Sequence, residues 1–301
     1  MKSKQPKPYN ITDGVTYSIL SDFTACRVRC RNRLMGITPE RMRDALDVGH
    51  MMHEILALYY TEGEDAARLK FTKRYLGKQH LMSENDITNV YKVMSLYEAY
   101  VKYYGKKDDK LDWLWAEKQF DVPFSVYRLR GMRDRAYRNK QQKTWLVETK
   151  TSSTLMEDAL MMELTYDLQN LLYLLATKIE TGHHVSGVLY DVIVKPSYRL
   201  GKNEDVVHFR ERVSDAILTE PNKYFHRYEI VYPQSEQVKF AMDLELLLQE
   251  FSRWWLGQSP TYRGQRTCRS RWNCEYIRLC ATGSMEGYQL DPKAPFGELE
   301  V

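Results

Sequence analysis

The feature that most constrains the fold is a change of hydrophobic period along the first half of the chain. Apolar residues recur at helical spacing over residues 39–60 and again from Ser83 to Val101, which predicts two helices. Ser83 is suited to cap the second helix, because Asp86 follows three residues later, and Gly105 lies beyond its end. Aromatic and β-branched residues then replace the helical pattern, which favours strands.

Three strands are predicted in succession, at residues 113–127, 129–137 and 144–150. Residues 155–179 contain no Gly or Pro and are rich in Leu, Met and Ala, so they predict one long helix that Gly182 ends. A buried strand is predicted at residues 186–194, and Pro196 closes it. We expect an exposed loop at residues 196–205 and a further helix at residues 237–255.

The bulk composition is that of a globular protein. The chain has 301 residues, of which 43% are hydrophobic, so it is long enough to bury a sizeable core. We expect a single domain over residues 1–301, with its core at about residues 40–196. No apolar run approaches the roughly 18 residues that a membrane span needs, and the first ten residues do not resemble a signal peptide. The sequence therefore predicts a soluble, cytoplasmic protein without a membrane partner.

Two neighbouring strands of the predicted meander carry candidate catalytic side chains. Side chains alternate faces along a strand, so Glu148 and Lys150 share one side. A hairpin would bring Asp134, on the preceding strand, next to Glu148. Two carboxylates facing one space suit a hard cation such as Mg²⁺ or Mn²⁺. Taken alone the pattern is weak, because Asp, Glu and Lys are common residues.

Further candidates lie on the flanking helices. Gly49 and His53 are one helical turn apart on the first helix, as are Gln169 and Tyr173 on the helix after Lys150. A lone His or Tyr at helical spacing more often packs in the core or lies at the surface than binds a ligand.

The ordered set of these residues resembles a known motif series. Gly49-x-x-x-His53, Gly131-x-x-Asp134, Glu148-x-Lys150 and Gln169-x-x-x-Tyr173 are similar to the motifs of RecB-like nucleases in the PD-(D/E)XK superfamily, which includes phage exonucleases and CRISPR-associated RecB-like proteins. The resemblance extends from about Ser18 to Cys280. It implies an α/β fold with a restriction-endonuclease-like αβββαβ core, in which helices flank a mixed central sheet, and with helical additions at both ends.

The resemblance also implies roles for individual residues. His53, Asp134, Glu148 and the backbone carbonyl of Thr149 would hold Mg²⁺ or Mn²⁺. Lys150 would orient or polarise the attacking water. Gln169 and Tyr173 would position the DNA backbone or the water at the metal site.

The function that follows is hydrolysis of phosphodiester bonds in DNA. The family favours an exonuclease over an endonuclease, acting in DNA processing, recombination or repair, with any helicase or recombination partner a separate chain. One alternative is a catalytically silent nucleic-acid-binding module of the same fold. Another is an iron-sulfur redox protein, which leaves the motif series unexplained. Oligomeric state stays open.

The five cysteines are unevenly placed, at positions 26, 30, 268, 274 and 280. An odd count without a signal peptide argues against a disulfide framework. AddB-type and CRISPR-associated relatives hold a [4Fe-4S] cluster with one N-terminal and three C-terminal cysteines. The resemblance therefore implies a cluster that staples residues 18–36 to residues 256–281. Its ligands would be Cys26, Cys268, Cys274 and Cys280.

Alternatives to this ligand set remain. Cys268 precedes Cys274 by six positions, where the family usually has Cys-x-x-Cys, and Cys30 is a second N-terminal candidate. Buried structural thiols and a Zn²⁺ site are the other readings, although the short cysteine knuckles typical of zinc are absent.

Both ends of the chain are rich in arginine. A staple would bring these arginines onto one surface that suits phosphate, and the alternative is an ordinary solvated face. The arginines concerned are Arg27, Arg29, Arg31, Arg33, Arg263, Arg266, Arg269 and Arg271.

Overall fold

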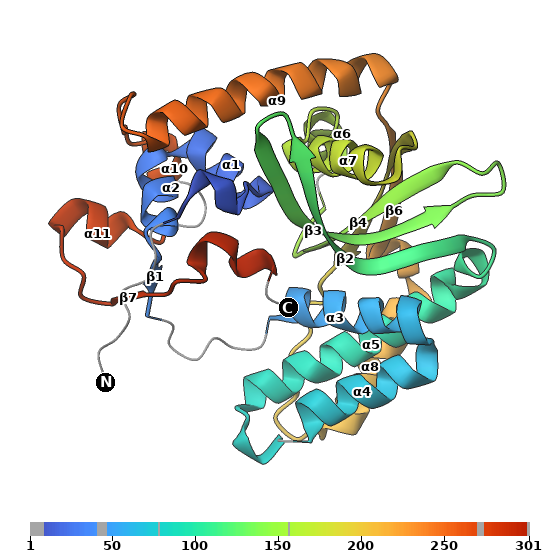
Figure 1. Cartoon of the computed structure of the whole chain (residues 1–301). Coiled ribbons are helices and arrows are strands. Elements are labelled where there is room, and N and C mark those ends of the chain that lie inside the picture. The colour runs from blue at the N-terminus through green and yellow to red at the C-terminus, as the bar shows by residue number, and fades with distance from the viewer. Residues whose placement is uncertain (1–8, 41–46, 78, 156, 270–273, 300–301) are drawn as a thin grey trace.

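A five-stranded mixed sheet runs through the middle of the molecule (Figure 1). The computed structural model describes residues 9–40, 47–77, 79–155, 157–269 and 274–299. The sheet order is β2-β3-β4-β5-β6; β4 and β5 are parallel and the other neighbours are antiparallel. The strands are β2 (Asp112–Phe124), β3 (Tyr127–Arg138), β4 (Thr144–Ser152), β5 (Val185–Val194) and β6 (Phe225–Val231).

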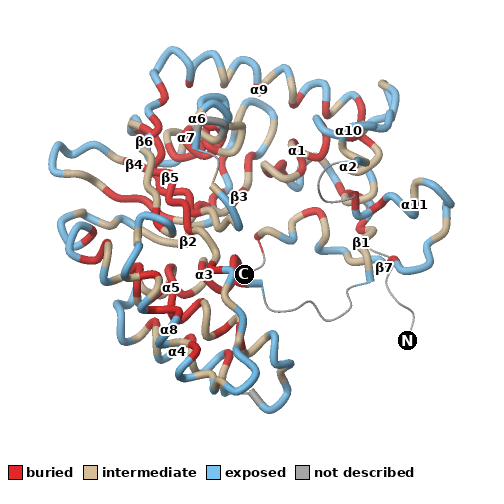
Figure 2. Tube along the Cα trace, turned by 180° about the vertical axis from the view of Figure 1, so that it is seen from behind, coloured by how far each residue is buried: buried red, intermediate tan, exposed pale blue. Residues whose placement is uncertain are grey.

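Helices cover both faces of this sheet, and the two layers bury separate apolar cores. One face packs on α3 (Val48–Glu62), α4 (Glu64–Leu76), α5 (Glu84–Asp108) and α8 (Val206–Thr219). The other packs on α1 (Tyr17–Ala25), α6 (Glu157–Leu164), α7 (Leu168–Thr181) and α9 (Gln234–Trp255). Figure 2 shows buried residues concentrated in the sheet strands and on the inner sides of these helices.

The two ends of the described chain lie together beside the sheet. β1 (Ile37–Pro39) pairs antiparallel with β7 (Tyr288–Leu290). The same region contains α2 (Arg27–Leu34), α10 (Gln265–Cys268), α11 (Ile277–Thr282) and the 3-10 segment η4 (Ala294–Leu299). Main-chain pairing therefore joins the ends of the chain. Three shorter 3-10 segments are η1 (Ile11–Asp13), η2 (Gln79–Leu81) and η3 (Pro221–Lys223).

The predicted order of helix, three strands, helix and strand is confirmed, and with it the α/β class. The single helix predicted over residues 155–179 is wrong, because α6 and α7 are separate. Asp167 caps α7 by accepting from the backbone N–H of Asn170 over 2.7 Å. A good N-cap side chain starts a new helix here although the residues before it are helix formers.

The ends of two predicted helices also shift. α3 begins at Val48, with Asp47 as its cap, whereas the prediction began at residue 39, which ends β1; residues 41–46 lie outside the described chain. α5 runs past Gly105 to Asp108. The structure adds α4, α8 and β6, which the hydrophobic pattern does not predict. The predicted loop is confirmed, since no helix or strand occurs between β5 and α8.

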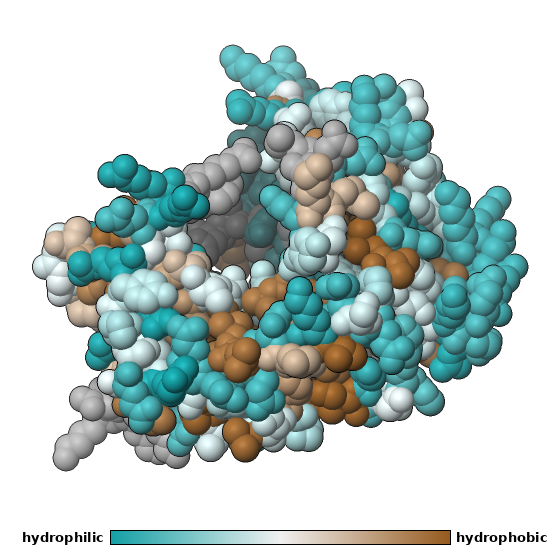
Figure 3. All heavy atoms as spheres, turned by 90° about the horizontal axis from the view of Figure 1, so that it is seen from above, coloured by the Kyte–Doolittle hydropathy of each residue, from teal (hydrophilic) through white to brown (hydrophobic). Residues whose placement is uncertain are grey.

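The face that carries α9 has hydrophobic patches among hydrophilic side chains (Figure 3). Three apolar residues of α9 are largely exposed there, namely Val238, Met242 and Leu246. Despite its length, α9 does not qualify as a membrane span, nor does any other helix in the described residues.

Candidate active site

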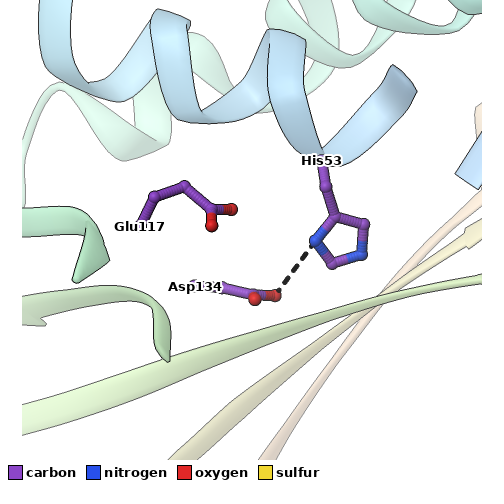
Figure 4. Close-up of side chains that lie close together, drawn as sticks. All are labelled: His53, Glu117 and Asp134. Carbon is purple, nitrogen blue, oxygen red and sulfur yellow. Dashed lines mark ion pairs between the residues drawn. The ribbon is translucent and has the colours of Figure 1, made fainter. Parts of the chain in front are cut away.

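Three ligand-type side chains meet between α3 and the sheet (Figure 4). One atom each of His53, Glu117 and Asp134 lies within 4.8 Å of the other two. His53 Nδ1 is 3.5 Å from Asp134 Oδ2. Among the described residues, these three are the His, Cys, Asp or Glu side chains that lie close enough together, as a group of three, to bind one metal ion.

Gly49 explains why His53 comes so close to the sheet. A Cβ atom at Gly49 would lie 2.7 Å from Thr151 Oγ1 on β4, closer than real Cβ contacts come. A glycine at this position therefore lets the first turn of α3 pass directly over β4. One turn later, the helix presents His53 to the same part of the sheet.

The position of Asp134 is fixed by the strand beside it. β3 pairs with β4 through Arg135 opposite Val147, which brings Asp134 level with the start of the Glu148 motif. The backbone N–H of Thr149 donates to Asp134 Oδ2 over 2.7 Å. Thr149 thus contacts the site through its N–H, while the carbonyl role implied by the resemblance stays a prediction.

Glu117 is a site residue that the sequence did not predict. It lies on β2 between the pairs Ala116–Arg135 and Lys118–Arg133, which places it opposite Asp134. Its φ of 45° is in the left-handed region, which is rare for a residue with a side chain and occurs often at functional sites. Its position between the aromatic residues Trp115 and Phe120 was the available signal, and it is a weak one because β2 also contains Asp112 and Asp121.

Glu148 and Lys150 form a second group next to the first. Lys150 Nζ donates to Glu148 Oε1 over 2.5 Å and to Gln169 Oε1 over 3.1 Å. Gln169 Nε2 also donates to Glu148 Oε1, over 2.9 Å. Three of the predicted site residues are therefore joined by hydrogen bonds at Glu148 Oε1. Glu148 is not part of the close group around His53, and its role as a metal ligand stays a prediction.

Tyr173 packs beside these residues on α7. Its ring contacts Phe120 with a centroid separation of 5.5 Å, and burial raises the pKa of its hydroxyl far above the ordinary value. A Cβ atom at Gly131 would lie 2.6 Å from the Phe120 ring and 3.2 Å from Tyr173. The glycine of the Asp134 motif therefore leaves room for Tyr173.

The electrostatics of the site favour a bound cation. Burial raises the pKa of Glu117 to about 8 and that of Glu148 to about 7, and the charge of Asp134 adds to both. Carboxylates that crowd together cannot all ionise without a counter-charge. Imidazole nitrogen with carboxylate oxygens is a donor set that Mg²⁺ or Mn²⁺ can use. The residues present therefore fit a divalent metal.

The predicted cysteine ligands gather at the junction of the chain ends. A Cβ atom at Gly264 would lie 3.3 Å from Cys26 Cβ, and the neighbouring Arg263 Nη2 donates to the Cys280 carbonyl over 3.5 Å. Burial raises the pKa of Cys280; Arg263 opposes the rise, and Cys26 and Cys268 add to it. Burial likewise raises the pKa of Cys274, with Cys268 and Cys280 contributing. Cys274 and Cys280 belong to one apolar cluster, and Cys26 and Cys280 both lie beside the segment that contains Arg263 and Gly264.

Cys30 lies one helical turn after Cys26, and its backbone N–H donates to the Cys26 carbonyl over 3.0 Å, but its side chain packs in the core. It is fully buried in the core and its Sγ donates to the Ile19 carbonyl over 3.6 Å. No three of the thiols in the described chain come as close together as the His53 group does.

Comparison with known proteins agrees with the geometry. Residues 15–281 match the PD-(D/E)XK nuclease superfamily. A solved structure from Eubacterium rectale named "Putative exonuclease" is 12% identical, with a TM-score of 0.51 over 94% of this chain and 99% of that one. The structure named SSO0001 is 13% identical, with a TM-score of 0.29 over 80% of this chain and 87% of its own. No curated protein matches the sequence. At such identities the first likeness concerns the fold alone, but the family match covers most of the chain, and this protein belongs to the PD-(D/E)XK nuclease superfamily.

Proposed function

We propose that this nuclease is a divalent-metal-dependent deoxyribonuclease, more specifically an exonuclease. The observation that carries the proposal is the convergence of His53, Glu117 and Asp134 beside the hydrogen-bonded Glu148 and Lys150. A donor set for a hard cation next to a positioned ammonium is the arrangement that phosphodiester hydrolysis needs. The exonuclease part is supported by the name of the similarly folded Eubacterium rectale protein.

Each group has a distinct part in the proposed reaction. His53, Glu117 and Asp134 would hold a Mg²⁺ or Mn²⁺ ion, which would supply positive charge for the phosphate oxygens when bound. The Thr149 N–H keeps the Asp134 carboxylate oriented toward that position. Lys150, fixed by two hydrogen bonds, orients the attacking water and stabilises the negative charge that develops.

Gln169 and Tyr173 act around Lys150. Gln169 bridges Glu148 and Lys150, so it holds the carboxylate and the ammonium in one geometry. Tyr173 keeps its proton, because burial raises the pKa of its hydroxyl well above its ordinary value. It is therefore available as a hydrogen-bond donor to a phosphate oxygen or to the water.

The test is cleavage of end-labelled linear and closed-circular DNA with Mg²⁺, with Mn²⁺ and with chelator. Glu148→Gln and Lys150→Ala should abolish metal-dependent shortening of the linear DNA. Glu236→Gln, an exposed acid on α9, is the matched control and should cleave normally. Circular dichroism shows whether the variants fold.

Two outcomes would replace this proposal. Nicking of the closed circle by the wild-type protein would make the enzyme an endonuclease. Binding of DNA without cleavage under any metal condition would favour the catalytically silent nucleic-acid-binding module.

We also propose that Cys26, Cys268, Cys274 and Cys280 bind a [4Fe-4S] cluster. The support is the gathering of these thiols where Gly264 and Arg263 reach Cys26 and Cys280. Four thiolates are the usual ligand set of such a cluster. When bound, the cluster supplies covalent ties across a junction that already contains the β1–β7 pairing.

Iron and sulfide content and the visible spectrum of anaerobically purified protein test the cluster. Cys26→Ala and Cys274→Ala should lose the iron-sulfur absorption. Cys30→Ala is the matched control and should keep it, because Cys30 packs in the core. Loss of the absorption in Cys30→Ala alone would overturn the ligand set, and zinc in place of iron would overturn the cluster.

A further inference from the structure

A surface cavity at the junction of the chain ends is lined by exposed arginines. Its volume is about 1220 Å³. The arginines come from two distant segments, α2 and the region around α10. They are Arg31, Arg263, Arg266 and Arg269. Among the described lining residues there is no Asp or Glu, so the cavity has one sign of charge.

Nearby carboxylates do not neutralise this charge, because other arginines already use them. Asp22 pairs with Arg29 over 2.9 Å and with Arg33 over 2.5 Å, and Glu250 pairs with Arg27. These pairs correct the predicted phosphate rim, since Arg27, Arg29 and Arg33 are engaged within the protein, and Arg271 lies outside the described residues.

The arginines of the cavity differ from those on other surfaces. Arg210 pairs with Glu98, and Arg278 pairs with Glu286, each over 2.5 Å. Arg31, Arg266 and Arg269, by contrast, form no ion pair with any described part of the chain. Several unpaired guanidinium groups around one cavity form a site for an anion, and guanidinium binds phosphate in a bidentate manner.

An aromatic ring lies among these charges. Tyr262 lines the cavity and is 51% exposed. The guanidinium carbon of Arg27 is 4.5 Å from the centre of its ring, which holds the ring in place. A basic groove with a fixed, exposed aromatic ring is the combination that binds single-stranded nucleic acid, because the ring can stack on a base.

Helix α1 connects this cavity to the candidate active site. It begins at Tyr17, where burial raises the pKa of the hydroxyl and the nearby charges of Asp167, Lys150 and Glu148 act on it. It ends at Ala25, whose carbonyl accepts from Thr267 Oγ1 of α10 over 3.1 Å. A helix of nine residues is about 13 Å long, a distance that a few nucleotides of one strand can span.

We propose that the arginine cavity binds the phosphate backbone of a single-stranded DNA segment, a few nucleotides from the scissile bond. The distance to the scissile bond rests on the proposed nuclease function; the binding itself does not. The bound strand enters between Arg31 of α2 on one side and Arg266 of α10 with Arg269 at the end of α10 on the other, with a base against Tyr262.

The test is fluorescence anisotropy of labelled DNA in chelator, where no cleavage interferes. The variant is Arg266→Ala with Arg269→Ala, both at exposed positions. Its affinity for a long oligo-dT strand should fall, and the slope of log affinity against log salt should become shallower by about 1.4, at roughly 0.7 per lost phosphate contact. The matched control, Arg199→Ala with Lys202→Ala, also removes two exposed positive charges and should change the slope little.

Cleavage assays then test whether the cavity lies a few nucleotides from the scissile bond. The double variant should cleave a long strand more slowly than the wild type does, and a dinucleotide substrate equally well. If the double variant binds the long strand with wild-type affinity and slope, or if the substitutions weaken the binding of duplex DNA alone, the cavity proposal is wrong. If wild-type protein never cleaves but the slope changes as expected, the nuclease proposal fails and the binding site stands. Arg31→Ala, from the other segment, should reproduce the weaker binding.

Discussion

Arg135 donates through Nη2 to Thr149 Oγ1 over 2.6 Å. Thr149 in turn donates its backbone N–H to Asp134, so a buried arginine supports a metal-ligand candidate through one residue. The Arg135 side chain is 2% exposed, and its guanidinium pairs with the fully buried Asp191 over 2.9 Å. It also lies over the Tyr60 ring of α3, 4.3 Å from its centre. The geometry of the site therefore depends on a buried ion pair within the sheet, between β3 and β5, whose arginine also contacts α3.

Arg135→Met should destabilise the protein strongly. The substitution keeps much of the side-chain volume, but among the described residues it leaves Asp191 with Arg227, at 3.3 Å, as its one charged partner. Breaking a buried ion pair typically costs about 3–5 kcal/mol, and the remaining arginine favours the lower end. Urea unfolding followed by circular dichroism measures the loss.

The matched control for that variant lies on the same strand. Arg138→Met removes a pair with Asp112 whose side chains are 38% and 64% exposed. Exposed pairs contribute at most about 1 kcal/mol, so this variant should unfold almost like wild type. Equal losses in the two variants would show that Arg135 contributes no more than a surface arginine.

Glu117→Gln should weaken divalent-metal binding by roughly 10-fold to 100-fold or more, on the scale of lost metal-site interactions. The amide keeps the shape of the side chain but removes the charge that faces His53 and Asp134. Calorimetric titration with Mn²⁺ measures the affinity, and Glu236→Gln on α9 serves as the charge-matched control. Unchanged Mn²⁺ affinity would remove Glu117 from the ligand set.

The sequence could predict the part of the site that lies on regular elements. His53 and Gln169 follow helical spacing, and Glu148 and Lys150 follow strand alternation, so their faces can be read from the pattern. Glu117 could not be found this way. The β2 register shifts between Trp113 and Trp115, and the left-handed φ of Glu117 breaks the alternation on which such a prediction depends.

The fold also has parts that the sequence could predict and parts that it could not. The central αβββαβ order was predictable, because each element has a strong period and buries most of one face. β6 is an edge strand with mixed burial, so its sequence carries little pattern. The break at Asp167 depends on one capping hydrogen bond, which outweighs the helix propensity of its neighbours.

Metal binding and stability should respond to pH in opposite directions. The folded pKa values of Glu117 and Glu148, about 8 and about 7, lie above the ordinary carboxyl value. A carboxyl group with a raised folded pKa contributes its full stability below the unfolded pKa of about 4.3, and this stability is lost as the pH rises to the folded pKa of about 7 to 8. In chelator, the free energy of unfolding should therefore fall from about pH 4.3 to about pH 8. Mn²⁺ affinity should rise over the same range, because binding needs the deprotonated carboxylates.

Denaturant unfolding in chelator and Mn²⁺ titration at several pH values measure the two trends. Glu117→Gln with Glu148→Gln removes both titrating groups and should flatten the stability curve between about pH 5 and pH 8. A wild-type protein that becomes more stable in chelator over this interval would contradict the assignment.

Gly131→Ala should disturb the site by overpacking. The added methyl would lie 2.6 Å from the Phe120 ring and 3.2 Å from Tyr173, so β3 or both rings must move. Overpacking in a core typically costs about 1–3 kcal/mol, which lowers Tm, and displacement of Tyr173 should slow DNA cleavage as well. Gly297→Ala is the matched control, because no atom lies within 4 Å of the added methyl. A Gly131→Ala protein with the Tm and cleavage rate of that control would show that the strand and the rings can separate without cost, and that the motif glycine is not needed to seat Tyr173.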